Sequence, residues 1–222
     1  MKVYDLSCTL EKGMWYYGSP YTPFDTEIAA SLERNGYIAR RIDMTTHTGT
    51  HVECQAHWDY QGKAVDQYDP ACFVGQAKVL RFDSNGQGFF AIGREALIAA
   101  GAEALEPGDI CIVDTKWDSQ KNAEKYFMES PFFTVDGARY LCEKKVKLVA
   151  FDFPMCGDPR DGMDFVPEGT PLPDTTFFNC GIPIVAALVG LSQVPDQVLF
   201  CGLPLKVAGA DGAPVRAVAI EL

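Results

Sequence analysis

The chain has 222 residues, of which 47% are hydrophobic and 22% are charged, proportions typical of a globular protein rather than a disordered one. Its 19 Lys and Arg residues are outnumbered by 30 Asp and Glu residues, which gives a formal net charge of -11. Nucleic acids and anionic membrane surfaces are bound by basic patches, so this charge argues against both as partners.

The sequence predicts one α/β domain over residues 1–222, because no repeat, low-complexity tract or charge block marks a boundary. Strands are predicted where Val, Ile, Phe and Tyr gather between Gly and Pro, and helices where apolar residues recur at helical spacing. In chain order we expect strands at 2–7, 37–46 and 73–83, a helix at 94–100, a strand at 109–114, a helix at 134–145, and strands at 146–153, 197–201 and 214–221.

One stretch, Gly157 to Asp174, shows no period and holds three Gly, four Pro and five acidic residues among its 18 positions. Structureless connections of that length are uncommon inside a compact domain and often serve as active-site lids or binding loops. A solvated surface insertion is the alternative.

The eight cysteines contain no C-x-x-C pair, and a chain of this length needs no disulfides to fold. The opening residues show no signal-peptide pattern, and the longest apolar stretch, Cys180 to Leu191, is broken by Pro183 and too short to cross a bilayer. We therefore expect a reduced, soluble, cytoplasmic protein.

All three histidines fall within one eleven-residue segment, His47-Thr-Gly-Thr-His51-Val-Glu-Cys-Gln-Ala-His57. A single histidine is most often a hydrogen-bonded structural residue. Three of them around a carboxylate, in an otherwise histidine-free chain, indicate a metal site. Imidazole nitrogen and carboxylate oxygen suit zinc, manganese or iron better than calcium.

The spacing of this segment has a geometric consequence. On a straight strand His47 and His51 would lie about 13 Å apart, too far to share an ion. The chain must therefore bend, and Gly49 is the residue that adopts a positive φ without steric cost. His51 and Glu53 point to one face if the chain is extended there. We predict that His47, His51 and Glu53 bind one divalent ion with open coordination positions, and that His57 transfers protons.

Other catalytic chemistries have less support. The chain contains no G-x-S-x-G elbow, no G-x-G-x-x-G and no P-loop, which argues against a serine hydrolase and a nucleotide cofactor. A Cys-His pair built on Cys54 is conceivable, although a small buried apolar role is the better prediction for that residue.

The histidine segment resembles the H-x-G-T-H-x-D-x-P-x-H signature of the metal-dependent cyclase family, which includes bacterial kynurenine formamidase and isatin hydrolase. The likeness covers nearly the whole chain. It continues in Asp5-Leu6-Ser7, Val113 to Asp118, Gly181 to Val185, Leu203 to Lys206 and Gly209 to Val218.

This resemblance implies a swivelling β/β/α fold and hydrolysis of small amides, lactams or related carbonyl compounds. It implies homodimers or homotetramers in which neighbouring chains help to wall the active site. It also implies that His47 and His51 bind the first metal, that Glu53 replaces the bridging aspartate, and that His57 is the proton-transfer residue.

Five positions depart from the family pattern. Glu53 stands in place of Asp, Gln55 in place of Pro, and Lys116 where Gly usually precedes the tryptophan. The His and Glu that complete a second metal site in the family correspond to Asp174 and Ala186, and no histidine follows residue 57. These departures predict a single bound ion, with zinc or manganese as the expected metal.

The leading hypothesis is a metal-dependent hydrolase of a small amide, lactam or ester, in which His57 accepts the proton of metal-activated water. Asp174 would support the ligands or contact the substrate. Aromatic candidates for a wall against a planar substrate, with core or interface packing as the alternative, are Trp15, Tyr16, Tyr17, Phe24 and Trp117. Two other hypotheses stay open: a family member that binds metal or ligand without turnover, and a lyase or isomerase that stabilises an enolate.

Overall fold

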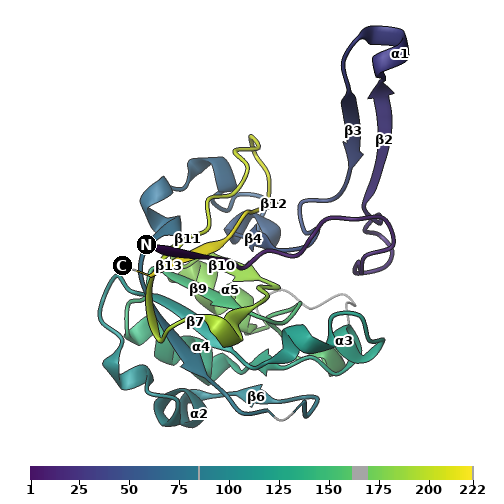
Figure 1. The fold of residues 1–222 in the computed structure, drawn as a ribbon. Coiled ribbons are helices and arrows are strands. Elements are labelled where there is room, and N and C mark those ends of the chain that lie inside the picture. Colours follow the sequence, from purple (N-terminus) through teal and green to yellow (C-terminus); the bar gives the residue numbers. More distant parts are fainter. Residues whose placement is uncertain (85, 162–169, 222) are drawn as a thin grey trace.

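The computed structural model describes residues 1–84, 86–161 and 170–221, and a nine-stranded mixed sheet forms its centre (Figure 1). In spatial order its strands are β1 (Lys2–Asp5), β13 (Val218–Glu221), β11 (Gln197–Cys201), β5 (Val74–Arg81), β7 (Ile110–Asp114), β9 (Leu148–Phe151), β10 (Ile184–Ala186), β4 (His51–Glu53) and β12 (Gly212–Pro214). The four central strands β5, β7, β9 and β10 are parallel, and every pairing outside them is antiparallel. The described residues therefore form a parallel core sheet with antiparallel margins.

The central strands are apolar on both faces because both faces are covered. In β7, Cys111 and Val113 belong to one buried cluster, whereas Ile110 and Ile112 belong to a second cluster on the opposite face. Such strands read as continuous apolar runs rather than as an alternating pattern.

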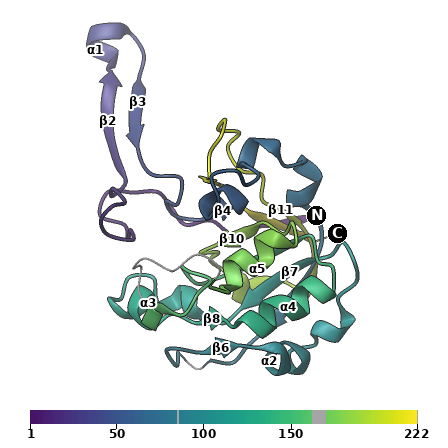
Figure 2. The same ribbon diagram turned by 180° about the vertical axis from the view of Figure 1, so that it is seen from behind.

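Helices cover the first face of the sheet, where α2, α4 and α5 lie side by side (Figure 2). The α-helices are α1 (Leu32–Asn35), α2 (Arg94–Ala99), α3 (Lys125–Met128), α4 (Val135–Glu143) and α5 (Pro173–Asn179). Short 3₁₀ turns are η1 (Gln55–His57), η2 (Val65–Gln67), η3 (Pro70–Phe73), η4 (Ala102–Ala104), η5 (Trp117–Gln120), η6 (Pro159–Asp161) and η7 (Leu191–Gln193). The longest helix, α4, begins at Thr134, whose hydroxyl accepts a hydrogen bond from the backbone N–H of Gly137.

The second face is enclosed by the sheet itself. Tyr4 in β1 and Ala213 in β12 come from opposite ends of the strand order, yet both belong to the cluster that also holds Val52 of β4. The sheet must therefore curl around this cluster. Curling brings β4 and β12, which carry the residues described below, against the centre of the molecule.

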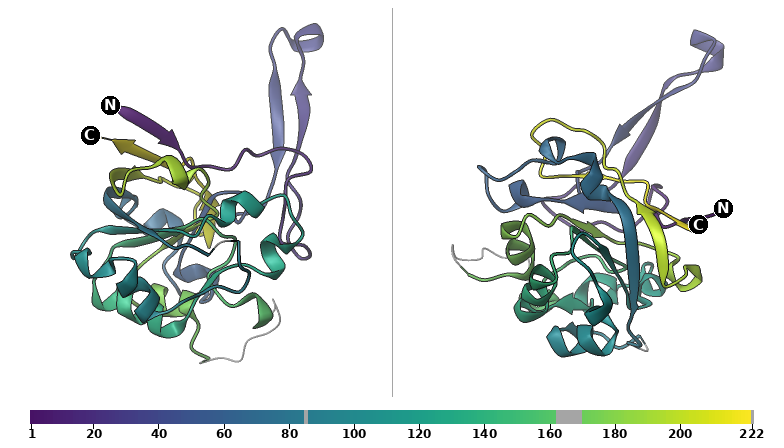
Figure 3. Two further views of the ribbon diagram at one scale, coloured as in Figure 1. Left: turned by 60° about the horizontal axis from the view of Figure 1, so that its bottom comes forward. Right: turned by 90° about the vertical axis from the view of Figure 1, so that its left-hand side faces the viewer.

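A hairpin of β2 (Asp25–Ala30) and β3 (Ala39–Asp43), tipped by α1, projects from this body (Figures 1 and 3). A second small sheet pairs β6 (Ala91–Ile92) with β8 (Phe132–Phe133) in parallel.

The predicted α/β class is confirmed, and each of the nine predicted elements overlaps an observed one. The prediction was wrong in detail at the C-terminus, where the single strand predicted at 214–221 is two strands, β12 and β13. The chain leaves the ladder between them, and the N–H of Val215 bonds to the carbonyl of Thr50. The prediction also missed helix α5, which begins inside the stretch 157–174 that was predicted to be structureless. Residues 162–169 of that stretch lie outside the described residues.

Among the described residues, no helix has the length and apolar character needed to cross a membrane.

Candidate active site

A sharp bend places His47 and His51 side by side, as their spacing required. Gly49 has a φ of 66°, and a side chain there would also meet Leu10, 2.6 Å from the added Cβ. After the bend, β4 pairs with β10 on one side and with β12 on the other. The two histidine ring centroids are 5.0 Å apart.

Three atoms that could bind a metal ion, one each from His47, His51 and Glu53, converge after this bend. His51 donates from Nδ1 to the carbonyl oxygen of Gly49 at 2.8 Å, which directs its Nε2 to Oε1 of Glu53 at 2.9 Å. Nδ1 of His47 lies 3.4 Å from the same Oε1. All three side chains are buried, with His51 fully inaccessible. The extended run of β4 therefore presents His51 and Glu53 on one face, as predicted.

Asp211 links the rings of His47 and His57, and no sequence pattern had indicated a role for it. Its Oδ2 lies 2.7 Å from Nε2 of His47 and 3.0 Å from Nδ1 of His57, and its Oδ1 accepts a hydrogen bond from Thr46 at 2.9 Å. The one sequence feature that could have drawn attention to Asp211 is the glycine that follows it, Gly212. Any side chain at Gly212 would collide with the carbonyl oxygen of Val52, so a glycine is required where β12 approaches β4.

The charges of this group are strongly coupled. Burial lowers the pKa of His47, but hydrogen bonds with Asp211 and Glu53 outweigh it and raise the pKa to about 9. Burial opposes ionisation of Glu53, yet hydrogen bonds from His47 and His51 hold its pKa well below the usual range. Hydrogen bonds from His47 and then His57 lower the pKa of Asp211. In the metal-free protein, a proton on His47 thus sits between two carboxylates.

These residues fit a divalent metal ion. The ligand atoms of His47, His51 and Glu53 lie within 4.8 Å of one another. Oε1 of Glu53 lies 2.9 Å from Nε2 of His51 and 3.4 Å from Nδ1 of His47. These distances are close to the roughly 3.4 Å expected between two ligand atoms that are each about 2.1 Å from one tetrahedral ion. Asp211 then holds the remote nitrogen of His47, an arrangement that fixes the ring orientation of metal-binding histidines. His47, His57 and Asp211 form a second group of the same size.

A pocket of about 310 Å³ opens beside these residues. His47, Glu53 and His57 line it, and together with His51 and Asp211, which contact them, they form the group that we call the histidine wall. Three further lining residues form the group that we call the carboxylate wall, which we define as Asp158, Asp161 and Asp174. Tyr17, Tyr21 and Trp58 supply aromatic surface, and Tyr17 donates its hydroxyl proton to the carbonyl of Pro154. The pocket therefore has room for a small planar molecule.

Asp174 lies in the pocket lining, on the first turn of α5, and is buried. Burial, and then the Glu53 carboxylate, raise its pKa to about 7. Ala186 pairs with His51 across β10 and β4 and offers only a methyl group there. Neither group of prospective metal ligands in the described part of the chain includes Asp174.

The two tryptophans predicted as substrate contacts lie outside the pocket lining, which corrects that expectation. Trp117 is fully buried, and its Nε1–H donates to the carbonyl of Tyr126 at 2.9 Å. Trp15 packs on Tyr17, Tyr126 and Phe127. Both side chains follow the core-packing alternative. Of the other aromatic candidates, Tyr17 lines the pocket and Phe24 is buried.

Cys54 does not have the surroundings of a nucleophile. Its thiol is buried and donates to the backbone carbonyl of Asp211 at 3.1 Å. Burial raises the pKa of Cys54 to about 12, which leaves almost no thiolate at neutral pH. The Cys-His alternative is therefore not supported.

Comparison with known proteins gives a consistent result. The family model described as "Putative cyclase" matches residues 4–156, more than half of the chain. The kynurenine formamidase of Bacillus cytotoxicus is 31% identical over 199 residues, 89% of this chain and 87% of that protein. Isatin hydrolase A from Labrenzia aggregata superposes with a TM-score of 0.87 at 21% identity, over 98% of this chain and 93% of that chain.

A structure described as a "predicted metal-dependent hydrolase from Bacillus stearothermophilus" is 27% identical, with a TM-score of 0.74 over 98% of this chain and 97% of that chain. The sequence motif, the curled fold and these matches lead to one conclusion. The chain belongs to the cyclase family.

Proposed function

We propose that this protein is a metal-dependent hydrolase of a small amide, lactam or ester. The observation that carries the proposal is a buried set of two imidazoles and one carboxylate, of which His47 and Glu53 line a pocket of about 310 Å³. Sites with three protein ligands and an open position are typical of catalytic rather than structural metals. The kynurenine formamidase relatives, and the hydrolase structure at 27% identity, support the same class of reaction.

His47, His51 and Glu53 would hold the ion. A divalent ion at that place polarises a substrate carbonyl and lowers the pKa of water toward 7. Zinc or manganese suits this set of nitrogen and oxygen donors. We propose one ion per chain, because Ala186 leaves only a methyl group beside His51 where a second carboxylate would be needed.

His57 is the proposed proton-transfer residue. Asp211 engages its Nδ1 at 3.0 Å, which orients the ring and leaves Nε2 for a water or a substrate atom in the pocket. Imidazole is the side chain best suited to exchange protons at neutral pH. His57 would accept a proton from the attacking water and return it to the leaving nitrogen or oxygen.

The test is metal analysis of protein purified without added ions, followed by a screen of formanilide, a small aryl lactam and an aryl ester. We expect about one zinc or manganese per chain, hydrolysis of at least one substrate, and loss of turnover with a chelator that the same metal reverses. Bound metal without turnover of any amide, lactam or ester would favour the non-catalytic alternative. Two ions per chain would refute the single-ion proposal.

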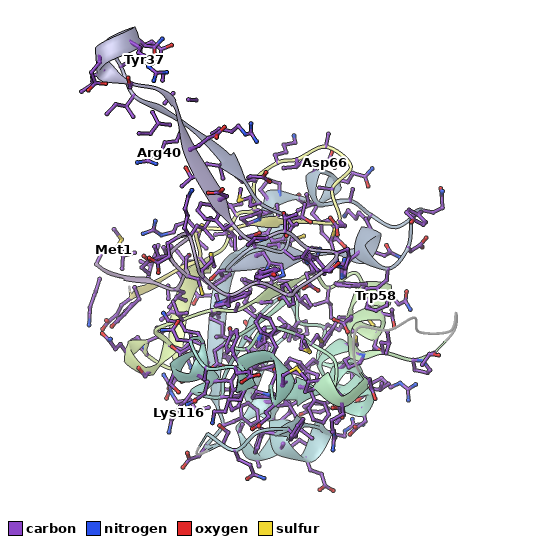
Figure 4. All side chains as sticks on the ribbon, turned by 90° about the vertical axis from the view of Figure 1, so that its right-hand side faces the viewer. Met1, Tyr37, Arg40, Trp58, Asp66 and Lys116 are labelled. Carbon is purple, nitrogen blue, oxygen red and sulfur yellow. The ribbon has the colours of Figure 1, made fainter. Side chains whose placement is uncertain are left out.

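We also propose that the protein works as a homodimer or homotetramer in the cytoplasm, without nucleic-acid or membrane partners. The hairpin supports the oligomer. Ile28 pairs with Arg40, and Ile42 pairs with Thr26, so both isoleucines lie on one face of the ribbon, and both are more than half exposed. Figure 4 shows Tyr37 and Arg40 far from the body.

An isolated two-stranded hairpin is only marginally stable in water, so a second copy of the chain is the proposed cover for this apolar face. Light scattering checks the assembly: a mass near two or four chains is expected, and a monomer at micromolar concentration contradicts it.

A further inference from the structure

The charges around the pocket bear on which substrates the proposed hydrolase accepts. Among the fourteen described lining residues, four are Asp or Glu and none is Lys or Arg. The undescribed residues 162–169 also contain no Lys or Arg in their sequence. A carboxylate on a substrate would therefore meet no Lys or Arg of this chain at the lining, and His47, which is protonated in the metal-free protein, is neutral when it binds an ion.

The basic residue nearest in sequence to the carboxylate wall is already engaged. Nε and Nη2 of Arg160 donate to Asp158 at 2.9 and 2.5 Å. The guanidinium also lies over the rings of Phe89 and Phe132, 5.3 and 5.5 Å from their centroids. The charges of Asp158 and Arg160 therefore neutralise each other, and Arg160 is not one of the described residues that line the pocket.

The inner end of the pocket is also balanced once a divalent ion is bound. The two charges of the ion are matched by Glu53 and by Asp211, which contacts His47 and His57. Asp161 and Asp174 remain among the lining residues. Within the described residues, no Lys or Arg forms an ion pair with either carboxylate. Asp161 is exposed, and Asp174, whose pKa burial raises to about 7, is ionised above that pH, so at pH 8 a bound molecule meets both negative charges.

We infer that the pocket accepts small aryl amides that are neutral or carry a cationic group such as an ammonium, and discriminates against amides that carry a carboxylate. This inference rests on the proposed hydrolase function for its turnover test, although the charge preference also applies to binding alone. Tyr17, Tyr21 and Trp58 supply the surface for the aryl ring.

Three probes with one formanilide core and 3-substituents of similar size, compared at pH 8, test the inference: 3-(hydroxymethyl)formanilide, 3-formamidobenzoate and 3-(aminomethyl)formanilide. At low salt we expect kcat/KM for the anionic probe to be at least tenfold below that of the neutral probe. The cationic probe should equal or exceed the neutral one. The penalty on the anionic probe should shrink as salt increases, because mobile ions screen the carboxylate wall. Equal or better turnover of the anionic probe overturns the inference.

Asp161→Asn locates the effect. Its loss of one charge should narrow the ratio between neutral and anionic probes by several fold. Glu106→Gln is the matched control, because it removes one exposed carboxylate on the turn before β7, outside the pocket lining, and should leave the ratio unchanged. An identical change in both variants would assign the effect to net charge and overturn the inference.

Binding separates this inference from the hydrolase proposal. Benzamide, 3-carbamoylbenzoate and 3-(aminomethyl)benzamide lack the N-formyl group and are titrated by calorimetry into the metal-loaded protein, with an ammonia assay on the same solution to check that they stay intact. If no formanilide is hydrolysed but the benzamides bind in the expected charge order, the hydrolase proposal fails and the charge preference stands. If formanilides are hydrolysed without a charge order, the preference fails and the hydrolase stands. No binding by any benzamide, together with no turnover, overturns both.

Discussion

The two walls of the pocket hold their charged groups in different ways. In the histidine wall, each side chain has at least one partner in the same wall: Glu53 between two imidazoles, Asp211 between His47 and His57. In the carboxylate wall, only Asp158 has a cationic partner among the described residues. Pre-arranged partners fix donor atoms, whereas uncompensated charge acts on whatever enters. The first wall therefore suits the proposed metal ion and proton transfer, and the second suits the inferred substrate discrimination.

His51→Ala should break the histidine wall most completely. The variant loses the Nε2 that faces Glu53, and no other described side chain is placed to replace it at that buried position. We expect bound metal to fall from about one ion per chain to background by elemental analysis, and hydrolysis to fall with it. His57→Asn is the control, because it removes a histidine without removing a proposed ligand. Unchanged metal in His51→Ala would show that the ligand assignment is wrong.

His57→Asn should separate proton transfer from metal binding. We expect the metal content and the melting temperature to stay near those of the wild type, while kcat falls about 10²–10⁴-fold, the usual contribution of general acid–base catalysis. A variant with full kcat would exclude His57 from the reaction. A variant that loses the ion would instead make His57 a ligand, through the group that it forms with His47 and Asp211.

Asp211→Asn should show how much metal binding depends on the orientation of the His47 and His57 rings. The amide oxygen still accepts a hydrogen bond but carries no negative charge to attract the ring protons of His47 and His57, and we expect metal affinity to fall about 10–100-fold, the usual effect of losing a carboxylate behind a metal-binding histidine. Competition with a fluorescent chelator measures the affinity. Asp66→Asn is the matched control: Asp66 accepts a hydrogen bond from Gly209 in the same loop but contacts no histidine. Equal effects in both variants would contradict an orienting role.

The histidine wall was the more predictable of the two. Its residues except Asp211 lie in one eleven-residue segment, and spacing alone required the bend at Gly49 and the common face of His51 and Glu53. Asp211 comes from a distant part of the chain, and no local period reports that β12 returns beside β4. The same reason explains why β4 and β10 were missed as strands: each has three residues, too few for a pattern.

The central strands and α4 were predictable because burial on both faces, or on one helical stripe, leaves a long apolar signature. Trp117 shows the limit of that approach. A tryptophan near a family motif is equally compatible with a pocket wall and with the core, and only the packing around Tyr126 decides between them. The carboxylate wall was visible in the sequence as an acidic stretch, but its place in the same pocket as the histidines was not.

Asp174→Asn tests the carboxylate wall through stability, with the smallest expected effect. Burial and the Glu53 carboxylate raise the pKa of Asp174 from 3.8 to about 7 in the metal-free fold. The folded protein then holds this proton more tightly than the unfolded chain does. Its stabilising contribution is complete below the unfolded value and is lost as the pH rises through 7, where Asp174 must ionise in a buried place. Asparagine never ionises, so the variant should lack this loss.

The measurement is the melting temperature of chelator-treated wild type and Asp174→Asn at pH 5 and pH 8, so that all other titrating groups cancel. We expect the variant to gain several degrees relative to the wild type between the two pH values, at about 2–4 °C for each kcal/mol in a chain of this size. A difference that stays constant with pH would mean that Asp174 is ionised throughout and is compensated by a cation. The carboxylate wall would then resemble the histidine wall, and the contrast between the two walls would be lost.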